Sequence, residues 1–257
     1  MIGKVEKYLL DKIQEDGVIH ITLLDPEKAS PQSASKTARE VESCKTAAIM
    51  VGGSTLTSTS NLDDVVKAIK KAVKIPVILF PNNITGICRH ADAIWFMSLL
   101  NSSDPYFIAG AQVLGAPLIK KFGLEAIPLG YIIVGENSAA SVVGRACPIP
   151  YNKPELAAAH ALAAQYFGMR FVYLEAGSGA KQPPPSDMIK AVKDLVNVPL
   201  IVGGGIRTSY QVKKAVSAGA DIIVTGTVVE EEKRVKDVIG ELVECTRLGG
   251  RSCNDSV

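Results

Sequence analysis

Short runs of apolar residues recur along the whole chain, and most of them are separated by segments with helical periodicity. The runs are almost continuously apolar instead of alternating, which is typical of parallel strands covered by helices. We predict eight strands from them: residues 17–24, 46–51, 76–80, 92–97, 127–134, 170–175, 199–203 and 221–225. Eight strands with intervening helices favour an α/β fold of the closed (β/α)₈ TIM barrel type over an open sheet.

Three helical segments between these strands carry boundary signals. Residues 61–73 repeat apolar side chains at helical spacing, and Asn61 is a candidate N-cap. Residues 208–218 are expected to begin at Thr208 and to end before a glycine. Residues 154–167 are rich in alanine and start with a proline, which the first turn of a helix tolerates.

The connection between the third and fourth predicted strands breaks the alternation. Residues 81–91 (PNNITGICRHA) contain a proline and a glycine and show no apolar helical stripe. A crossover helix barely fits in that length. We therefore expect the third helix of the outer ring to be missing or replaced by a loop, which would leave an apolar groove on the barrel wall. A short, tilted helix that fills the gap is the alternative.

The longest irregular stretch is residues 135–153, directly after the fifth predicted strand. We expect it over the C-terminal mouth of the barrel, where loops often carry function or act as lids. Nothing marks a second domain, and the chain length of 257 residues is close to the roughly 250 of one such barrel. Residues 1–257 are therefore expected to form a single domain.

Composition and charge exclude several classes of protein. The net charge of only +2 argues against binding of a nucleic-acid backbone over a broad basic surface. Five cysteines, odd in number and never spaced as CxxC, argue against a disulfide framework or a zinc site. No apolar run is long enough to cross a bilayer, and the first residues lack a signal segment. We expect a cytoplasmic protein that binds no nucleic acid.

Three glycine-containing segments follow the late strands: YLEAGSGA (173–180), VGGGIR (202–207) and VTGTV (224–228). Glycine lets backbone N–H groups approach a phosphate closely, and a following helix N-terminus adds partial positive charge. Phosphate sites near strands seven and eight are common in these barrels. One segment alone could be only a tight turn, but three at equivalent positions predict a phosphate-binding site.

Tyr173 and Glu175 lie two residues apart on the sixth predicted strand, so their side chains point to the same side. If that side is inward, a phenol and a carboxylate lie at the mouth beside the phosphate. Burying a carboxylate without a partner is costly, so Glu175 is expected to bind a ligand or to act in catalysis. The alternative is that Glu175 only orders its own loop.

The first predicted strand ends in LLDPEK and the second in VGGST, which places Asp25 and Ser54 at neighbouring strand ends. A carboxylate and a hydroxyl there could hold Mg²⁺, which keeps several waters and needs few protein ligands. The alternatives are a turn aspartate before Pro26 and a serine that only caps its loop. On the fourth strand, Trp95 and Phe96 are expected in the core, although Trp95 could line the groove.

LLDPEK, VGGST, FMSLLNSSDP, YIIVG, YLEAGSGA and VGGGIR occur in the order and spacing of geranylgeranylglyceryl phosphate synthases. The chain resembles an archaeal member of that family over essentially its whole length. The resemblance implies a magnesium-dependent prenyltransferase of archaeal ether-lipid biosynthesis. The free primary hydroxyl of sn-glycerol 1-phosphate would attack the first carbon of geranylgeranyl diphosphate and release diphosphate.

The resemblance also implies a homo-oligomer, a prenyl chain lying in the groove left by the third helix, and peripheral membrane contact for product release. Asp25 and Ser54 match the family's magnesium positions, and Glu175 matches the group that hydrogen-bonds the glycerol and accepts its proton. The residues matching the glycerol-phosphate site are Tyr173, Leu174, Glu175, Ala176, Gly177, Ser178, Gly179, Gly204, Gly205, Gly226 and Thr227. Some relatives have a lysine where this chain has Leu23, which leaves open which cation helps to neutralise the substrates.

Two other interpretations of the residues stay open. A phosphosugar isomerase or indole-synthesis barrel would share the late-strand phosphate loops, but it would need an acid–base pair across the mouth and no magnesium. A non-catalytic scaffold for a phosphate ligand would bind without turnover and would be unaffected by Glu175→Gln.

Overall fold

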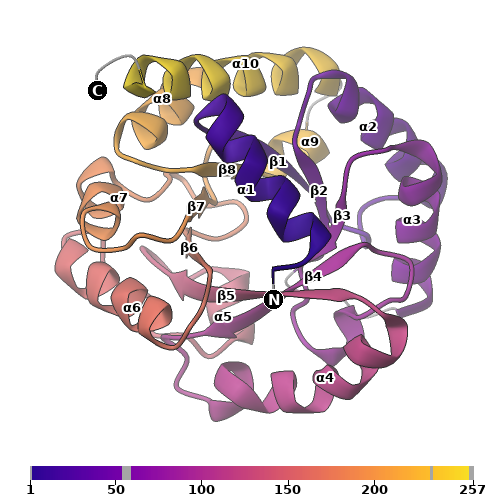
Figure 1. The fold of residues 1–257 in the computed structure, drawn as a ribbon, viewed down its shortest axis with the longest axis horizontal. Helices are drawn as coiled ribbons and strands as arrows, with labels where there is room; N and C mark the ends of the chain where they lie inside the picture. Colours follow the sequence, from indigo (N-terminus) through magenta and orange to yellow (C-terminus); the bar gives the residue numbers. More distant parts are fainter. Residues whose placement is uncertain (1, 54–58, 232–233, 255–257) are drawn as a thin grey trace.

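The computed structural model describes residues 2–53, 59–231 and 234–254, and its strands close into one parallel barrel in the order β1 to β8 (Figure 1). The strands are β1 (Ile19–Leu24), β2 (Ala48–Val51), β3 (Val77–Leu79), β4 (Ala93–Leu99), β5 (Glu125–Ile133), β6 (Phe171–Glu175), β7 (Leu200–Gly203) and β8 (Ile222–Thr225). Each predicted strand is present, with ends that differ by at most two residues. The predicted TIM-barrel fold is confirmed.

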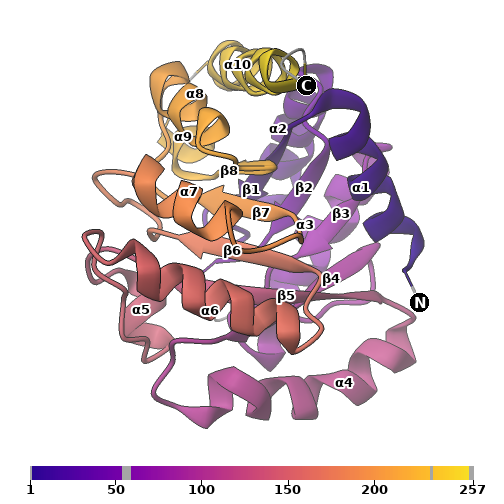
Figure 2. The same ribbon diagram turned by 60° about the vertical axis from the view of Figure 1, so that its left-hand side comes forward.

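Helices surround this barrel, as Figures 1 and 2 show from two sides. They are α1 (Lys4–Asp16), α2 (Pro31–Ser43), α3 (Thr59–Ala72), the π-helix η2 (Tyr106–Gly110) with α4 (Ala111–Phe122), α5 (Ala139–Val143), α6 (Pro154–Tyr166), α7 (Ser186–Lys193), α8 (Ser209–Ser217), α9 (Thr227–Glu231) and α10 (Val235–Asn254). The three predicted helical segments correspond to α3, α6 and α8. Among the residues that the structure describes, no helix is long and apolar enough to cross a bilayer.

Two predicted helix boundaries can be compared with the structure. Thr208 caps α8 as expected, because its hydroxyl accepts a hydrogen bond from the backbone N–H of Gln211 in a capping box. The prediction for Asn61 is wrong. The helix α3 already begins at Thr59, and the Asn61 side chain instead donates to the carbonyl of Pro26. Asn61 therefore ties α3 to the loop after β1.

The connection between β3 and β4 contains a single 3-10 turn, η1 (Ile84–Gly86), within residues 80–92. The Asn83 side chain orders this turn by accepting a hydrogen bond of 2.7 Å from the backbone N–H of Thr85. The turn contacts both α3 and α4, so it lies between them. The prediction that a loop replaces the third helix of the outer ring is confirmed.

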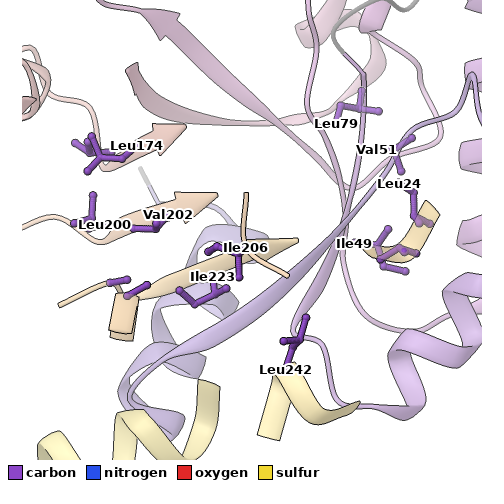
Figure 3. Packing of buried hydrophobic residues seen from close by; sticks show 14 of the residues in the cluster. Leu24, Ile49, Val51, Leu79, Leu174, Leu200, Val202, Ile206, Ile223 and Leu242 are labelled. Atoms are coloured by element: carbon purple, nitrogen blue, oxygen red, sulfur yellow. The ribbon is translucent and has the colours of Figure 1, made fainter. Parts of the chain in front are cut away.

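Strand side chains alternate between two apolar clusters. Along β6, Phe171 and Tyr173 point into the barrel, whereas Leu174 points outward to the helices. Figure 3 shows part of this outer cluster, which includes Leu174, Val202 of β7 and Leu242 of α10. Full burial of one such side chain contributes about 1.5–3 kcal/mol, so both clusters are needed to hold the strands in their register.

The helix α1 closes the N-terminal end of the barrel, across which it lies in Figure 1. Its residues Val5 and Leu9 join the interior cluster. The Glu125 carboxylate at the start of β5 accepts hydrogen bonds of 2.8 Å from the backbone N–H groups of Val5 and Glu6, which also suits the positive end of the helix dipole. Glu6 is fully buried and pairs with Arg170.

A histidine lies inside this closed end. The ring nitrogens of His20 lie 3.0 Å from the hydroxyl of Thr46 and 2.9 Å from that of Thr225. Burial lowers the pKa of His20 to about 3. His20 is therefore a neutral, hydrogen-bonded part of the core at ordinary pH.

Residues 135–153 are less irregular than predicted, because they contain the short helix α5. Ser138 and Ser141 form a reciprocal capping box at its start. The position of the segment over the mouth is as expected: a β-carbon added to Gly177 would lie 2.3 Å from the side chain of Ser138. The Asn101 side chain fastens the segment by donating to the carbonyl of Cys147 at 2.9 Å.

Candidate active site

A large cavity opens at the C-terminal mouth of the barrel. One part is polar and lies at the strand ends, and its lining includes Asp25, Lys28, Tyr173, Glu175, Ser178, Gly204, Gly205, Arg207, Gly226 and Thr227. The other part is apolar and runs to the loop between β3 and β4 and to α4. The two parts are continuous, so a ligand with a charged head and an apolar tail fits the lining.

Glu175 ends β6 and points into the cavity, as the alternation of β6 requires. It is 6% exposed, and its Oε1 accepts a hydrogen bond of 2.6 Å from the backbone N–H of Gly177. Burial raises the pKa of Glu175, and the contacts with Tyr173 and with the Gly177 N–H offset part of that rise. The prediction that Tyr173 and Glu175 face inward is confirmed, and the raised pKa suits a proton acceptor.

Gly204 allows the loop after β7 to reach this carboxylate. Its φ is +78°, and an added β-carbon would lie 2.4 Å from Oε1 of Glu175. The next loop residues are held by Arg207, whose Nη1 donates to the carbonyl of Ala180 at 2.8 Å. The glycine segments after β6 and β7 are thus packed against each other at the mouth.

The segment 173–179 does not present all its side chains to the cavity. Tyr173, Glu175 and Ser178 line it. The side chain of Leu174 instead points away into the outer cluster, so Leu174 offers the cavity no side chain. The remaining members, Ala176, Gly177 and Gly179, are not among the residues that line it; the Ala176 backbone N–H donates to the carbonyl of Gly203 within the barrel.

Asp25 follows the end of β1 and lines the same polar part. Its Oδ1 accepts a hydrogen bond of 2.9 Å from the backbone N–H of Glu27, and its Oδ2 lies 4.0 Å from Nζ of Lys28. A β-carbon on Gly53 would lie 2.6 Å from Oδ1, so that glycine lets the loop after β2 pass close to Asp25. Ser54, the other predicted magnesium ligand, lies outside the described residues.

The donor set at Asp25 fits a magnesium ion better than an enclosed metal centre. Among the residues that the structure describes, no group of three or more His, Cys, Asp and Glu side chains could hold a metal. Mg²⁺ is commonly bound through one or two carboxylates together with waters and substrate phosphates. A single carboxylate beside glycine-rich loops at the mouth is consistent with that mode.

The apolar part of the cavity is the groove expected from the missing helix. Its lining includes Ile84, Ile87, Ile94, Phe96, Gly115 and Ile119. A β-carbon on Gly115 would lie 2.9 Å from Cδ1 of Ile87, so glycine keeps α4 close to the loop here. Trp95 belongs to the interior cluster and also lines the cavity, whereas its neighbour Phe96 lines the cavity and packs against the outer cluster. Phe96 is therefore the aromatic residue on the outer wall of the groove.

Several cavity residues were not identified as site residues from the sequence, among them Lys28, Phe80, Tyr131 and Arg207. A signal existed for Tyr131, which is the β5 register partner of Tyr173 and must therefore face the same way. Arg207 directly follows the glycines of VGGGIR, where a cation beside the phosphate loop could have been suspected. Phe80 carried no such signal, because its aromatic neighbours come from other strands. Lys28 lies three residues after Asp25 in LLDPEK, where a cation beside that carboxylate could also have been suspected.

The fold and this site define a TIM barrel whose mouth joins glycine-rich loops to an apolar groove. The chain belongs to the PcrB family, whose model matches residues 11–246.

Proteins named geranylgeranylglyceryl phosphate synthase are similar to this chain over nearly its whole length. The protein from Thermofilum pendens is 55% identical over 249 residues, which cover 97% of each chain. The protein from Pyrococcus furiosus is 54% identical, with 96% of this chain and 98% of that protein covered. The crystal structure of (S)-3-O-geranylgeranylglyceryl phosphate synthase from Thermoplasma acidophilum, in complex with sn-glycerol-1-phosphate, is 39% identical with a TM-score of 0.92. The match between the two structures covers 96% of this chain and 100% of the Thermoplasma acidophilum chain.

Proposed function

We propose that this protein joins sn-glycerol 1-phosphate to geranylgeranyl diphosphate, forming the first ether bond of an archaeal membrane lipid and releasing diphosphate. The observation that carries the proposal is one continuous cavity, in which glycine-rich loops and a buried carboxylate adjoin an apolar groove. The names of the relatives support the same reaction. An isomerase or a phosphate-binding scaffold would leave the groove without a use.

Glycerol phosphate is held at the glycine-rich end of the cavity. Backbone N–H groups around Gly204, Gly205 and Gly226 bind its phosphate, and Arg207 adds positive charge. Anchoring the phosphate orients the distal hydroxyl towards Glu175. The hydroxyl is then held in position for the reaction and does not have to find it by diffusion. Glu175 accepts the hydroxyl proton as the oxygen bonds to the first prenyl carbon and the carbon–oxygen bond to diphosphate breaks.

Asp25 is the proposed magnesium ligand, with Ser54 as the second ligand. When bound, Mg²⁺ supplies charge neutralisation for the departing diphosphate. Lys28 lies on the same side of the cavity, 4.0 Å from Asp25, so its ammonium also faces the diphosphate end. Lys28 and Arg207 thus supply positive charge to the substrates, which Leu23, in the position where some relatives have a lysine, does not.

The geranylgeranyl chain occupies the apolar groove beside η1 and α4. Each methylene group buried there contributes about 0.8 kcal/mol to binding. Residues such as Ile84, Ile87 and Phe96 exclude water from the chain without polar contacts. The groove therefore sets the register of the reacting carbon relative to Glu175.

The proposal includes a homo-oligomeric, cytoplasmic enzyme that touches the membrane surface when it releases its product. Large apolar side chains on the outside of α4 and α5 support contacts of this kind: Val113 is 71% exposed, Leu114 is 60% exposed and Val142 is 70% exposed. Sedimentation of the protein with and without lipid vesicles tests both points.

A turnover assay tests the proposed reaction. The protein is incubated with geranylgeranyl diphosphate and labelled glycerol phosphate, with and without magnesium, using the 1-phosphate and 3-phosphate enantiomers in parallel. We expect magnesium-dependent ether product, preferentially from the 1-phosphate. Absence of ether product from both enantiomers contradicts the reaction, and equal product after removal of the metal with a chelator contradicts the role of magnesium.

A further inference from the structure

Three aromatic rings meet at the mouth of the barrel. Phe80 follows β3, Tyr131 is in β5 and Tyr173 is in β6. The ring centroids of Phe80 lie 5.5 Å from Tyr131 and 5.7 Å from Tyr173, and those of the two tyrosines lie 5.4 Å apart. Phe80 is nearly parallel to Tyr173, with an interplanar angle of 26°, and stands edge-to-face with Tyr131. All three side chains line the cavity.

The three rings lie where the polar and apolar parts of the cavity join. Tyr173 adjoins Glu175 on the polar side, and Phe80 immediately precedes the loop that carries Ile84 and Ile87 of the groove. A prenyl diphosphate with its head near Asp25 and its tail in the groove must pass these rings. Its first carbon must also lie near Glu175, where the glycerol hydroxyl is activated. The reacting carbon is thus confined to the neighbourhood of the rings.

Phe80 is the ring that remains accessible from the cavity. Tyr173 is completely buried and Tyr131 is only 6% exposed, whereas Phe80 is half-buried. A phenylalanine ring also has no hydroxyl that could compete with glycerol for an electrophilic carbon. Its π face carries partial negative charge, which attracts a cation within about 6 Å of the centroid.

Building on the prenyl transfer proposed above, we propose that Phe80 is a catalytic residue whose ring stabilises the positive charge on the allylic carbon, with Tyr131 and Tyr173 holding that ring in place. The bond between the first prenyl carbon and diphosphate breaks, and its electron pair leaves with the diphosphate. The glycerol oxygen bonds to the same carbon and its proton passes to Glu175. The ring of Phe80 is unchanged by the reaction, because it contributes only electrostatic attraction.

Packing alone could also explain three rings at the top of a barrel, so the test must change charge without changing shape. Site-specific replacement of Phe80 by mono-, di- and trifluorophenylalanine weakens the π face stepwise and adds little volume. The matched control is the same series at Phe122, which is also half-buried but lies at the end of α4 and does not line the cavity. The readouts are kcat and KM for geranylgeranyl diphosphate.

We expect kcat to fall steadily along the Phe80 series, by about tenfold to thirtyfold at trifluorophenylalanine, since a desolvated cation–π contact is of that strength. KM should change little, and the Phe122 series should leave kcat constant. A flat kcat across the Phe80 series, in a protein that makes ether product, overturns the role of Phe80 and leaves the proposed function standing. If the unmodified protein makes no ether product, the proposed function itself fails, and this inference fails with it.

Discussion

The two ends of the barrel differ in how their buried polar side chains are paired. At the N-terminal end, Glu6 pairs with Arg170, Glu125 accepts two backbone hydrogen bonds and His20 lies between two hydroxyls. At the mouth, Glu175 is buried with a backbone N–H as its partner and forms no ion pair among the described residues. The paired groups of the closed end therefore stabilise the fold. The mouth instead keeps a buried carboxylate that lowers stability but is available for catalysis.

Substitutions at the two ends should therefore affect different properties, with activity lost at the mouth and stability lost at the closed end. A buried group that is fully paired contributes to folding, and its loss is felt throughout the molecule. A buried charged group whose partner is a ligand lowers the stability of the ligand-free protein. Replacing it with a neutral side chain should therefore raise the free energy of unfolding.

Glu175→Gln should lower kcat by about 10²- to 10⁴-fold, because the proton acceptor is lost. The free energy of unfolding at neutral pH should stay equal or rise. The folded pKa of Glu175 is raised above its ordinary value of 4.5, so its contribution to stability is present below pH 4.5 and is lost as the pH rises through the folded pKa. Steady-state kinetics and urea unfolding measure the two quantities. A variant that is both less stable and fully active would contradict the assignment of Glu175 as the proton acceptor.

Glu6→Gln at the closed end should lower the free energy of unfolding by about 1–3 kcal/mol and leave kcat unchanged, since the buried carboxylate loses its charged contact with Arg170. The matched control is Glu155→Gln, whose pair with Lys153 is exposed and contributes about 0–1 kcal/mol. Urea unfolding of both variants gives the comparison. Equal loss in the two variants would show that the closed end has no special role in stability.

Gly204→Ala should weaken binding of glycerol 1-phosphate by about tenfold, because a β-carbon 2.4 Å from Oε1 of Glu175 displaces the loop. The control is Gly179→Ala. Gly179 also has a positive φ, of +76°, but an added β-carbon meets nothing within 4 Å, so this variant isolates the backbone strain from the clash. Calorimetric titration measures both affinities, and equal losses would place the effect in strain alone.

His20→Gln should change how stability depends on pH. The folded pKa of about 3 lies below the ordinary 6.5, so the contribution of His20 is present above pH 6.5 and is lost as the pH falls towards 3. Wild-type stability should fall by up to about 1.4 kcal/mol per pH unit more steeply than that of the variant. Urea unfolding between pH 6.5 and 4 measures this, with the partly exposed His160→Gln as the control. Identical slopes in His20→Gln and wild type would contradict it.

The barrel itself could be predicted because its signals are local. The buried parallel strands are near-continuous apolar runs, and the cap at Thr208 needs only neighbouring residues. The missing third helix follows from the shortness of residues 81–91. The helix α5 was missed because its capping box uses Ser138 and Ser141 instead of a glutamate or glutamine at the third position.

The candidate site could be predicted only in part. Asp25, Glu175 and Gly204 carry strong local signals, and the structure places all three on one cavity. Phe80 could not be found, because barrel closure brings it beside Tyr131 and Tyr173 of strands far apart in the chain. Lys28 was overlooked although it lies only three residues after Asp25. Conversely, Leu174 lies inside a recognisable motif, but strand alternation turns its side chain away from the cavity.

A crystal structure with glycerol 1-phosphate and a non-hydrolysable thiodiphosphate analogue of the prenyl substrate would locate both substrates in the cavity. We expect the phosphate on the loops of Gly204 and Gly226, and the prenyl chain in the groove between η1 and α4. The first prenyl carbon should lie over Phe80 and within reach of the glycerol hydroxyl beside Glu175. A prenyl chain bound outside the groove, or a phosphate away from the glycine loops, would contradict the account.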